Sequence, residues 1–261
     1  MTETQPPALH VTGLRKSFDG VRVLHDFELT ISAQSQAAVA ILGQNGAGKT
    51  TLLNLITRLV PADAGRIEVF GRDVLAGSAR HLAGYGVART FQSPRLLLDE
   101  TCLGNVALGA QSIKRGGRNG EGAAAMRRAT EALERVGLAA QAGRVAGTLP
   151  FGSRKLVELA RALALQPRLL LLDEPAAGLS DLEEGRLAEV LTGLTDAGIT
   201  LLLIEHRMAL VAAAARRVVM MDGGAIVFDG DAAAAIASPL VRERYLGAGF
   251  DQVKPEGSDR Q

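Results

Sequence analysis

The sequence predicts an α/β fold whose core is interrupted by a helical insertion. Short apolar runs that end at turn residues alternate with patterns of helical periodicity, as expected for strands and helices that follow one another along the chain. Between residues 94 and 166 the strand signals stop and helical patterns take over. The 261 residues are 47% hydrophobic and 22% charged, so the chain has enough apolar content to bury a sizeable core.

The first part of the chain predicts strands around one helix. Residues 37–42 are all apolar and predict a buried strand. Residues 49–59 have helical spacing, and Pro61 is predicted to end this helix because proline clashes with the preceding turn. Two further strands are predicted at residues 67–70 and 86–91.

The insertion predicts helices, at residues 101–111, 123–136 and 153–165. Gly137 is a helix stop for the second of them and Pro167 for the third. Residues 114–122 are basic and rich in glycine, so they predict an exposed loop between the first two helices.

The last part of the chain returns to strands, at residues 169–172, 200–204 and 218–221. Gly223 and Gly224 predict a hairpin turn into a strand at residues 225–228. Residues 251–261 are polar and predict a frayed tail.

Charge and cysteine content exclude several classes of protein. The 29 Lys and Arg against 28 Asp and Glu give a formal charge of +1, which offers no bulk attraction to nucleic acid. The single cysteine, Cys102, allows no intramolecular disulfide and no cysteine-cluster metal site. The first ten residues do not resemble a secretory signal, and every apolar run is far shorter than the roughly 20 residues that span a bilayer. We therefore expect a soluble, cytoplasmic chain that serves a membrane only through a partner.

The strongest chemical motif is GQNGAGKT at residues 43–50, which fits G-x-x-x-x-G-K-[ST] between a predicted strand and a predicted helix. Glycines let main-chain N–H groups approach phosphates closely. Lys49 is predicted to reach the β- and γ-phosphates of a nucleoside triphosphate, and Thr50 to ligate Mg²⁺. The predicted nucleotide-binding residues of this loop are Gly43, Asn45, Gly46, Ala47, Gly48, Lys49, Thr50 and Thr51.

Two carboxylates form the second half of the predicted site. Asp173 and Glu174 directly follow the apolar run at residues 169–172. Asp173 is predicted to help hold Mg²⁺. Glu174 is placed to accept a proton from the attacking water. The sequence thus predicts hydrolysis of a nucleoside triphosphate.

With three further motifs, these stretches resemble the ATP-binding subunit of ABC transporters over nearly the whole chain. The further motifs are Phe91-Gln92, the LPFGS stretch at residues 149–153, which is similar to the family's signature motif, and His206 after an apolar strand. The resemblance implies ATP and Mg²⁺ as ligands. It also implies a P-loop NTPase fold of the ABC ATPase type, with a RecA-like core, an antiparallel β subdomain and an inserted helical subdomain.

The implied division of the chain is discontinuous. Residues 1–92 and 167–250 form the nucleotide-binding core, residues 93–166 form the helical subdomain with the signature motif, and residues 251–261 are the polar tail.

The resemblance also implies roles for individual side chains. Gln92 touches Mg²⁺ or the attacking water, and His206 donates a hydrogen bond to the γ-phosphate. Gly152 and Ser153 present main-chain N–H groups to a nucleotide held by a second chain. Phe18 matches the aromatic residue that stacks on adenine, although a Phe beside a turn also suits a small core anchor.

Three positions depart from the family's common pattern. Pro150 stands where the signature motif usually has serine, and Ser153 where it usually has glutamine. Ser180 stands where Asp or Asn is usual. Phosphate contact at the signature therefore depends on main-chain N–H groups, with fewer side-chain contacts.

The partners that the resemblance implies are other subunits. A second ABC ATPase, which is either another copy or a related chain, forms a head-to-tail dimer with this one. The dimer works with transmembrane permease subunits at the cytoplasmic face of the membrane, and indirectly with an extracytoplasmic binding protein. No nucleic acid is implied.

Some stretches are similar to one subfamily, the ATPases of branched-chain (hydrophobic) amino acid importers. They are ARTFQ at residues 88–92 followed by RL at residues 95–96, LPFG at residues 149–152, DEPAAGL at residues 173–179 and RYLG at residues 244–247. Three alternatives are weighed against this cargo: a urea or amide importer, a lipid or lipopolysaccharide exporter, and a soluble ABC ATPase that acts on ribosomes or DNA. The largely apolar residues 94–101 are either a permease-docking patch or the core of the insertion.

Overall fold

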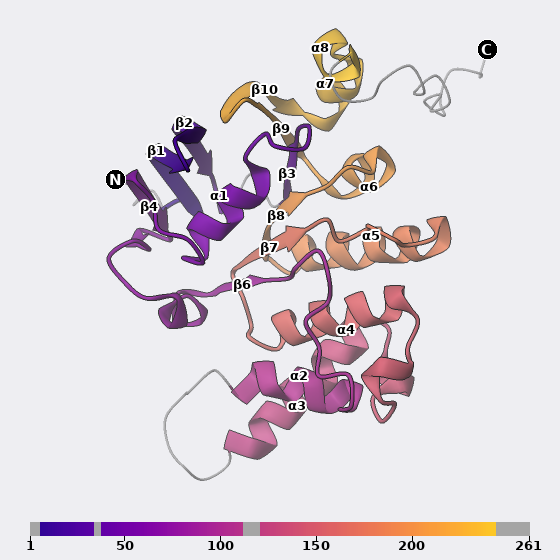
Figure 1. The fold of residues 1–261 in the computed structure, drawn as a ribbon. Helices are drawn as coiled ribbons and strands as arrows, with labels where there is room; N and C mark the ends of the chain where they lie inside the picture. Colours follow the sequence, from indigo (N-terminus) through magenta and orange to yellow (C-terminus); the bar gives the residue numbers. More distant parts are fainter. Residues whose placement is uncertain (1–5, 34–37, 112–120, 244–261) are drawn as a thin grey trace, which may run out of the picture.

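The computed structural model describes residues 6–33, 38–111 and 121–243, which form two sheets with helices around them (Figure 1). The smaller sheet has the strand order β2-β1-β4-β5 and is antiparallel. Its strands are β1 (Leu9–Phe18), β2 (Val21–Ile31), β4 (Ala64–Val69) and β5 (Arg72–Asp73).

The larger sheet has the order β10-β9-β3-β8-β7-β6. Its strands are β3 (Ala38–Leu42), β6 (Val87–Arg89), β7 (Leu169–Asp173), β8 (Thr200–Ile204), β9 (Arg217–Asp222) and β10 (Ala225–Asp231). All neighbours pair in parallel except β10, which is antiparallel to β9. Because parallel strands end at the same side of a sheet, the loops that follow β3, β7 and β8 begin side by side.

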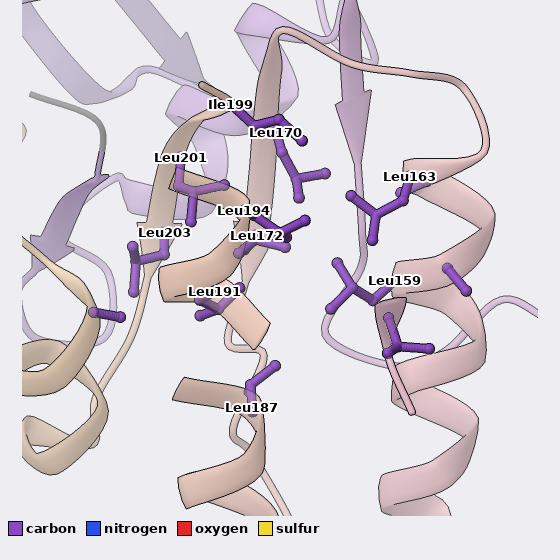
Figure 2. Close-up of a cluster of buried hydrophobic side chains, with 14 of the residues drawn as sticks. Leu159, Leu163, Leu170, Leu172, Leu187, Leu191, Leu194, Ile199, Leu201 and Leu203 are labelled. Atoms are coloured by element: carbon purple, nitrogen blue, oxygen red, sulfur yellow. The ribbon is translucent and has the colours of Figure 1, made fainter. Parts of the chain in front are cut away.

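Every residue of β3, β7 and β8 is buried, because both faces of the large sheet are covered. Leu169 and Leu171 share one core with α1 (Lys49–Ile56) and the antiparallel sheet. Leu170 and Leu172 point to the opposite face, toward leucines of α4 and α5 (Figure 2). The unbroken apolar runs in the sequence reflect this burial on both sides.

The segment between β6 and β7 is helical and lies below the sheet in Figure 1. It contains α2 (Cys102–Gln111), α3 (Glu121–Arg135) and α4 (Phe151–Leu163). At Gly109 of α2, an added Cβ would lie 2.5 Å from the main-chain oxygen of Arg161 in α4. These two helices therefore approach each other backbone to backbone.

The remaining helices are α5 (Asp181–Asp196), α6 (Met208–Ala214), α7 (Ala232–Ala237) and α8 (Pro239–Val241). The described residues also contain four short 3₁₀ helices, which are η1 (Ala79–His81), η2 (Ala83–Tyr85), η3 (Ala139–Gln141) and η4 (Ala146–Thr148). In the described part of the chain, no helix combines the length and the apolar character needed to cross a bilayer.

The α/β prediction and the predicted strands of the large sheet are confirmed. The predicted end of the first helix is wrong, because α1 ends at Ile56 and not before Pro61. The Thr57 hydroxyl donates to the main-chain oxygen of Leu53 at 2.6 Å, and Arg58 adopts a left-handed φ of 56°. This left-handed backbone turns the chain away from the helix axis, and the Arg58 guanidinium donates to main-chain oxygens in the segment after β5.

Other boundaries differ less. The helix predicted at 153–165 begins two residues earlier, at Phe151, which places Gly152 and Ser153 in its first turn. Of the basic loop predicted at 114–122, residues 114–120 lie outside the described residues, and its last two begin α3. The predicted tail and the RYLG stretch also lie outside the described residues.

Candidate functional site

Glycines let the loop between β3 and α1 pack closely against neighbouring strands. Gly43, Gly46 and Gly48 have positive φ angles of 149°, 86° and 96°. A Cβ on Gly43 would lie 2.3 Å from the main-chain oxygen of Met221 in β9, and one on Gly48 would lie 3.0 Å from that of Val23 in β2. At Gly46 an added Cβ would meet nothing within 4 Å. The loop is therefore packed on its underside and open at Gly46.

Lys49 lies beneath this loop. Its Nζ donates to the main-chain oxygens of Gly43 at 2.5 Å and Gln44 at 2.8 Å. Burial lowers the pKa of Lys49, and the charges of Glu174 and Asp173 act in the opposite direction. A buried ammonium thus supports the loop and lies within electrostatic reach of two carboxylates.

The start of α1 completes an environment that fits phosphate. The first N–H groups of a helix have no acceptor within the helix, and Gly48 at the N-cap offers no side-chain oxygen to them. Gln44, Asn45 and Thr50 are exposed, and Thr51 is half-buried. Uncapped amides, an open glycine and a buried ammonium together suit the charge and shape of a triphosphate.

Asp173 forms a buried ion pair that the motif analysis missed. Its Oδ2 accepts from Nη2 of Arg89 at 2.8 Å, and both side chains are 5% exposed. Arg89 also donates to Asn54 at 2.8 Å and to Thr57 at 2.9 Å. Burial lowers the pKa of Arg89, and the bond and charge of Asp173 oppose this. Arg89 fixes the position of Asp173.

Three residues predicted from separate motifs meet at one carboxylate. Nε2 of Gln92 donates to Oε2 of Glu174 at 2.7 Å, and Nε2 of His206 lies 2.9 Å from Oε1 of the same side chain. The side chains of His206 and Glu174 are 35% and 20% exposed. A carboxylate held from both sides and open to solvent is suited to act as a general base toward water.

Two buried charged residues lie near Glu174, and the motifs in the sequence did not predict them. Nζ of Lys155 in α4 donates to the main-chain oxygens of Glu174 at 2.6 Å and Pro175 at 3.3 Å. The carboxylate of Glu205 accepts main-chain N–H bonds from Ala176 at 3.1 Å and His206 at 2.7 Å. The sequence offered one kind of signal for both residues, a charge next to apolar residues. Lys155 precedes apolar residues in α4, and Glu205 directly follows β8.

The signature residues lie on the helical segment. Gly152 is buried, and a Cβ there would come within 2.3 Å of Oε1 of Glu183, so α5 packs closely against the start of α4. Ser153 is half-buried. Ser180, which departs from the family pattern, is the N-cap of α5, and its hydroxyl donates to the Glu183 carboxylate at 2.8 Å.

Exposure bears on the alternatives given for Phe18 and for the apolar stretch after Gln92. Phe18 is 41% exposed at the β1–β2 hairpin, with Nζ of Lys16 lying 5.0 Å from its ring centroid, so it is not a buried core anchor. In the apolar stretch after Gln92, Leu97 and Leu98 are exposed, whereas Leu96 packs against the core.

Mg²⁺ fits this site as a companion of the nucleotide. Within residues 6–33, 38–111 and 121–243, no three His, Cys, Asp or Glu side chains are grouped as a metal site. An Mg²⁺ ion that binds with a triphosphate needs only one or two protein oxygens, because phosphates and water complete its shell. The Asp173 carboxylate and the Thr50 hydroxyl are oxygens of the required type.

Comparisons with known proteins show what the chain as a whole is similar to. The family model described as ABC transporter matches residues 24–177. BraF, the high-affinity branched-chain amino acid transport ATP-binding protein of Pseudomonas aeruginosa, is 34% identical over 257 residues, with 92% of this chain and 98% of BraF covered. The aliphatic sulfonates import ATP-binding protein SsuB of Cupriavidus necator is 38% identical over 248 residues, with 95% and 75% covered.

A solved structure shows the same likeness. The ADP conformation of MJ1267, an ATP-binding cassette of an ABC transporter, superposes with a TM-score of 0.79 at 29% identity, covering 92% of this chain and 99% of that one.

Proposed function

Because the chain belongs to the ABC transporter family, we propose that it is the ATP-hydrolysing subunit of an importer for branched-chain or other hydrophobic amino acids. Its fold is that of the ABC ATPase cassette. The observation that carries the proposal is the meeting of Gln92 and His206 at the Glu174 carboxylate. The second support is the glycine loop with its buried Lys49, which lies within electrostatic reach of Glu174.

In the proposed reaction, the loop amides and Lys49 bind the β- and γ-phosphates. Glu174 accepts a proton as the oxygen of water bonds to the γ-phosphorus and the bond from that phosphorus to the bridging oxygen of ADP breaks. Gln92 orients the water and holds the carboxylate, and His206 donates to the γ-phosphate once nucleotide is bound. Thr50, Asp173 and Gln92 would hold Mg²⁺, which would neutralise charge on the phosphate oxygens when bound.

The working unit is a head-to-tail dimer with a second ABC ATPase. In that dimer, the N–H groups of Gly152 and Ser153 face the nucleotide of the partner chain, and Phe18 stacks on adenine. Residues 93–166 act as the helical subdomain of the discontinuous core proposed for residues 1–92 and 167–250. The exposed Leu97 and Leu98 suit a permease contact.

The cargo proposal follows the likeness to BraF. The dimer sits at the cytoplasmic face of the membrane on permease subunits, which receive the amino acid from an extracytoplasmic binding protein. A second candidate is import of another small organic solute, because the sulfonate importer subunit SsuB is 38% identical. In this proposal the site binds ATP and not the cargo, so it supports both candidates equally.

The experiment for the chemical proposal is Glu174→Gln in the full chain. The variant should bind ATP and lower phosphate release by at least about 100-fold, because the amide keeps the shape of the side chain and loses the base. With ATP and Mg²⁺ it should also accumulate as a dimer, measured by light scattering.

Two variants control this experiment. Glu189→Gln makes the same charge change on the exposed face of α5 and should hydrolyse ATP normally. Lys49→Ala should lose ATP binding itself, since no ammonium group then balances the negative charge of the phosphates. Normal turnover in Glu174→Gln would remove Glu174 from the role of base.

A further inference from the structure

A buried lysine outside the recognised motifs holds the main chain of the proposed base. Lys155 is 7% exposed and lies one turn after Gly152 in α4. Its ammonium donates to the main-chain oxygens of Glu174 and Pro175 at 2.6 and 3.3 Å. A lysine that is buried to this extent is rare unless its charge is balanced by hydrogen-bond or ionic partners.

Glu174 needs such support because its backbone conformation is unfavourable. Its φ is 47°, in the left-handed region that residues with a Cβ seldom adopt. Its N–H donates to the main-chain oxygen of Ile204 in β8 at 2.9 Å, and its own oxygen accepts from Lys155. The peptide groups on both sides of the strained Cα are therefore held, one by the sheet and the other by α4.

The charge of Lys155 is balanced by the site. Burial lowers the pKa of Lys155, and the charges of four carboxylates oppose this shift. In order of size, the opposing groups are Glu205, Glu174, Glu158 and Asp173. Charge-assisted bonds to carbonyl oxygens are stronger than neutral ones, so the ammonium is an effective clamp on this turn.

The same face of α4 also holds the segment that carries Gln92. The carboxylate of Glu158 accepts from the N–H groups of Phe91 at 3.3 Å and Arg95 at 3.0 Å. Glu158 lies three residues after Lys155, so the two side chains share one side of the helix. The Gln92 segment and the Glu174 turn are thus attached to one rigid element through separate contacts.

We infer that Lys155 is a positioning residue for ATP hydrolysis, which holds the turn after β7 so that the Glu174 carboxylate stays between Gln92 and His206. This inference rests on the function proposed above. Because Glu158 holds the Gln92 segment independently, loss of Lys155 releases only the Glu174 side of the contact. Misplacement of a catalytic group by about 1 Å can lower a rate about 100-fold.

The test compares Lys155→Met, which keeps the length of the side chain and removes the donor, with Lys155→Arg, which keeps a cation. In the full chain, kcat of Lys155→Met should fall about 10- to 100-fold, while ATP affinity, measured with a fluorescent ATP analogue, stays within about threefold. Lys155→Arg should recover most of kcat. Arg154→Met removes a neighbouring cation of α4 whose guanidinium lies over the Phe151 ring, and it should behave like wild type.

A double variant separates positioning from general stability. In Lys155→Met/Glu174→Gln, the loss should equal that of Glu174→Gln alone, because the lysine acts through that carboxylate. An unchanged kcat in Lys155→Met would overturn the inference. So would an additive loss in the double variant, or a loss of ATP affinity as large as the loss of kcat.

Two safeguards keep the result interpretable. If Lys155→Met does not fold, Lys155→Gln takes its place, since its amide can donate to one of the two oxygens and should give an intermediate kcat. Failure of the function proposed above would look different: wild type would release no phosphate, or Glu174→Gln would keep normal turnover whatever residue 155 is.

Discussion

At the scale of single residues, the ion pair between Arg89 and Asp173 ties the site to the stability of the whole fold. Both side chains are almost fully buried. A buried charge that loses its partner is left without compensation, whereas the pair itself contributes little net stability. The residue that would hold Mg²⁺ is therefore also one that the fold cannot leave unpaired.

We expect Arg89→Met to lower the free energy of unfolding by about 3–5 kcal/mol, because it strands the Asp173 carboxylate. Urea denaturation followed by circular dichroism measures this in a chain without tryptophan. Arg89→Met/Asp173→Asn should be more stable than Arg89→Met alone, since the unpaired charge is gone. Equal stability of the two variants would contradict this account.

The sequence could predict those site residues that follow strands. Gln92, Glu174 and His206 each come just after a strand of a parallel sheet, and strand ends meet whatever the details of packing. Arg89, Lys155 and Glu205 were missed because their partners depend on tertiary packing. Arg89 bonds to a residue 84 positions away, Lys155 to one 19 away, and Glu205 to one 29 away.

At the scale of elements, the start of α5 is stabilised by Ser180, the residue that departs from the family pattern. Ser180 caps the helix. The Glu183 carboxylate accepts hydrogen bonds from the Ser180 main-chain N–H at 2.9 Å and from the Ser180 hydroxyl at 2.8 Å. These two bonds lower the pKa of Glu183, and the main-chain bond has the larger effect. Serine at this position therefore stabilises α5 directly.

Ser180→Ala should lower the free energy of unfolding by about 1 kcal/mol at pH 7. A carboxyl group with a lowered folded pKa contributes stability above its unfolded value of about 4.3, and this contribution is lost as pH falls through the folded value. The difference between variant and wild type should therefore shrink at about pH 3, because the hydroxyl is part of what lowers the pKa of Glu183.

Urea denaturation at the two pH values checks this prediction. Ser238→Ala is the matched control, since Ser238 caps α8 without a side-chain bond and should give no such pH dependence. The same difference at both pH values would exclude a contribution from Glu183.

Strands buried on both faces were predicted from their apolar runs, and α3 and α4 were predicted from their helical periodicity. β3, β7 and β8 are wholly apolar and were found at once. The helix α5 was missed, because Gly185 and Gly193 interrupt a sequence that buries only one narrow stripe. The strands β1 and β2 were missed because bulges shift their register and break the alternation of apolar residues.

At the scale of the whole molecule, the site is made by topology. The loops that follow β3, β7 and β8 begin side by side, and the main-chain bonds from Glu174 to Ile204 and from Glu205 to Ile41 connect them. Lys49 begins the helix that follows the loop after β3, Glu174 and His206 lie in the loops after β7 and β8, and Gln92 follows β6 at the edge of the same sheet. No single segment contains the chemistry, so the site exists only in the folded chain.

Transport tests the cargo at this scale. Deleting the gene in its host should abolish uptake of labelled leucine, isoleucine and valine, after redundant importers are removed. The wild-type chain should restore uptake and Glu174→Gln should not, since movement of the cargo depends on hydrolysis. Normal amino acid uptake with lost uptake of an aliphatic sulfonate would move the assignment to the second candidate.

The close approach of α2 and α4 at Gly109 has a mechanical consequence. With the backbone of one helix seated against the backbone of the other, no layer of side chains lies between them at that point to slide or repack. We expect the two helices to turn as one block. Because Lys155 of α4 bonds to the Glu174 turn, any swing of this block relative to the sheet would pull directly on the proposed base, so the two helices form a stiff lever on the site.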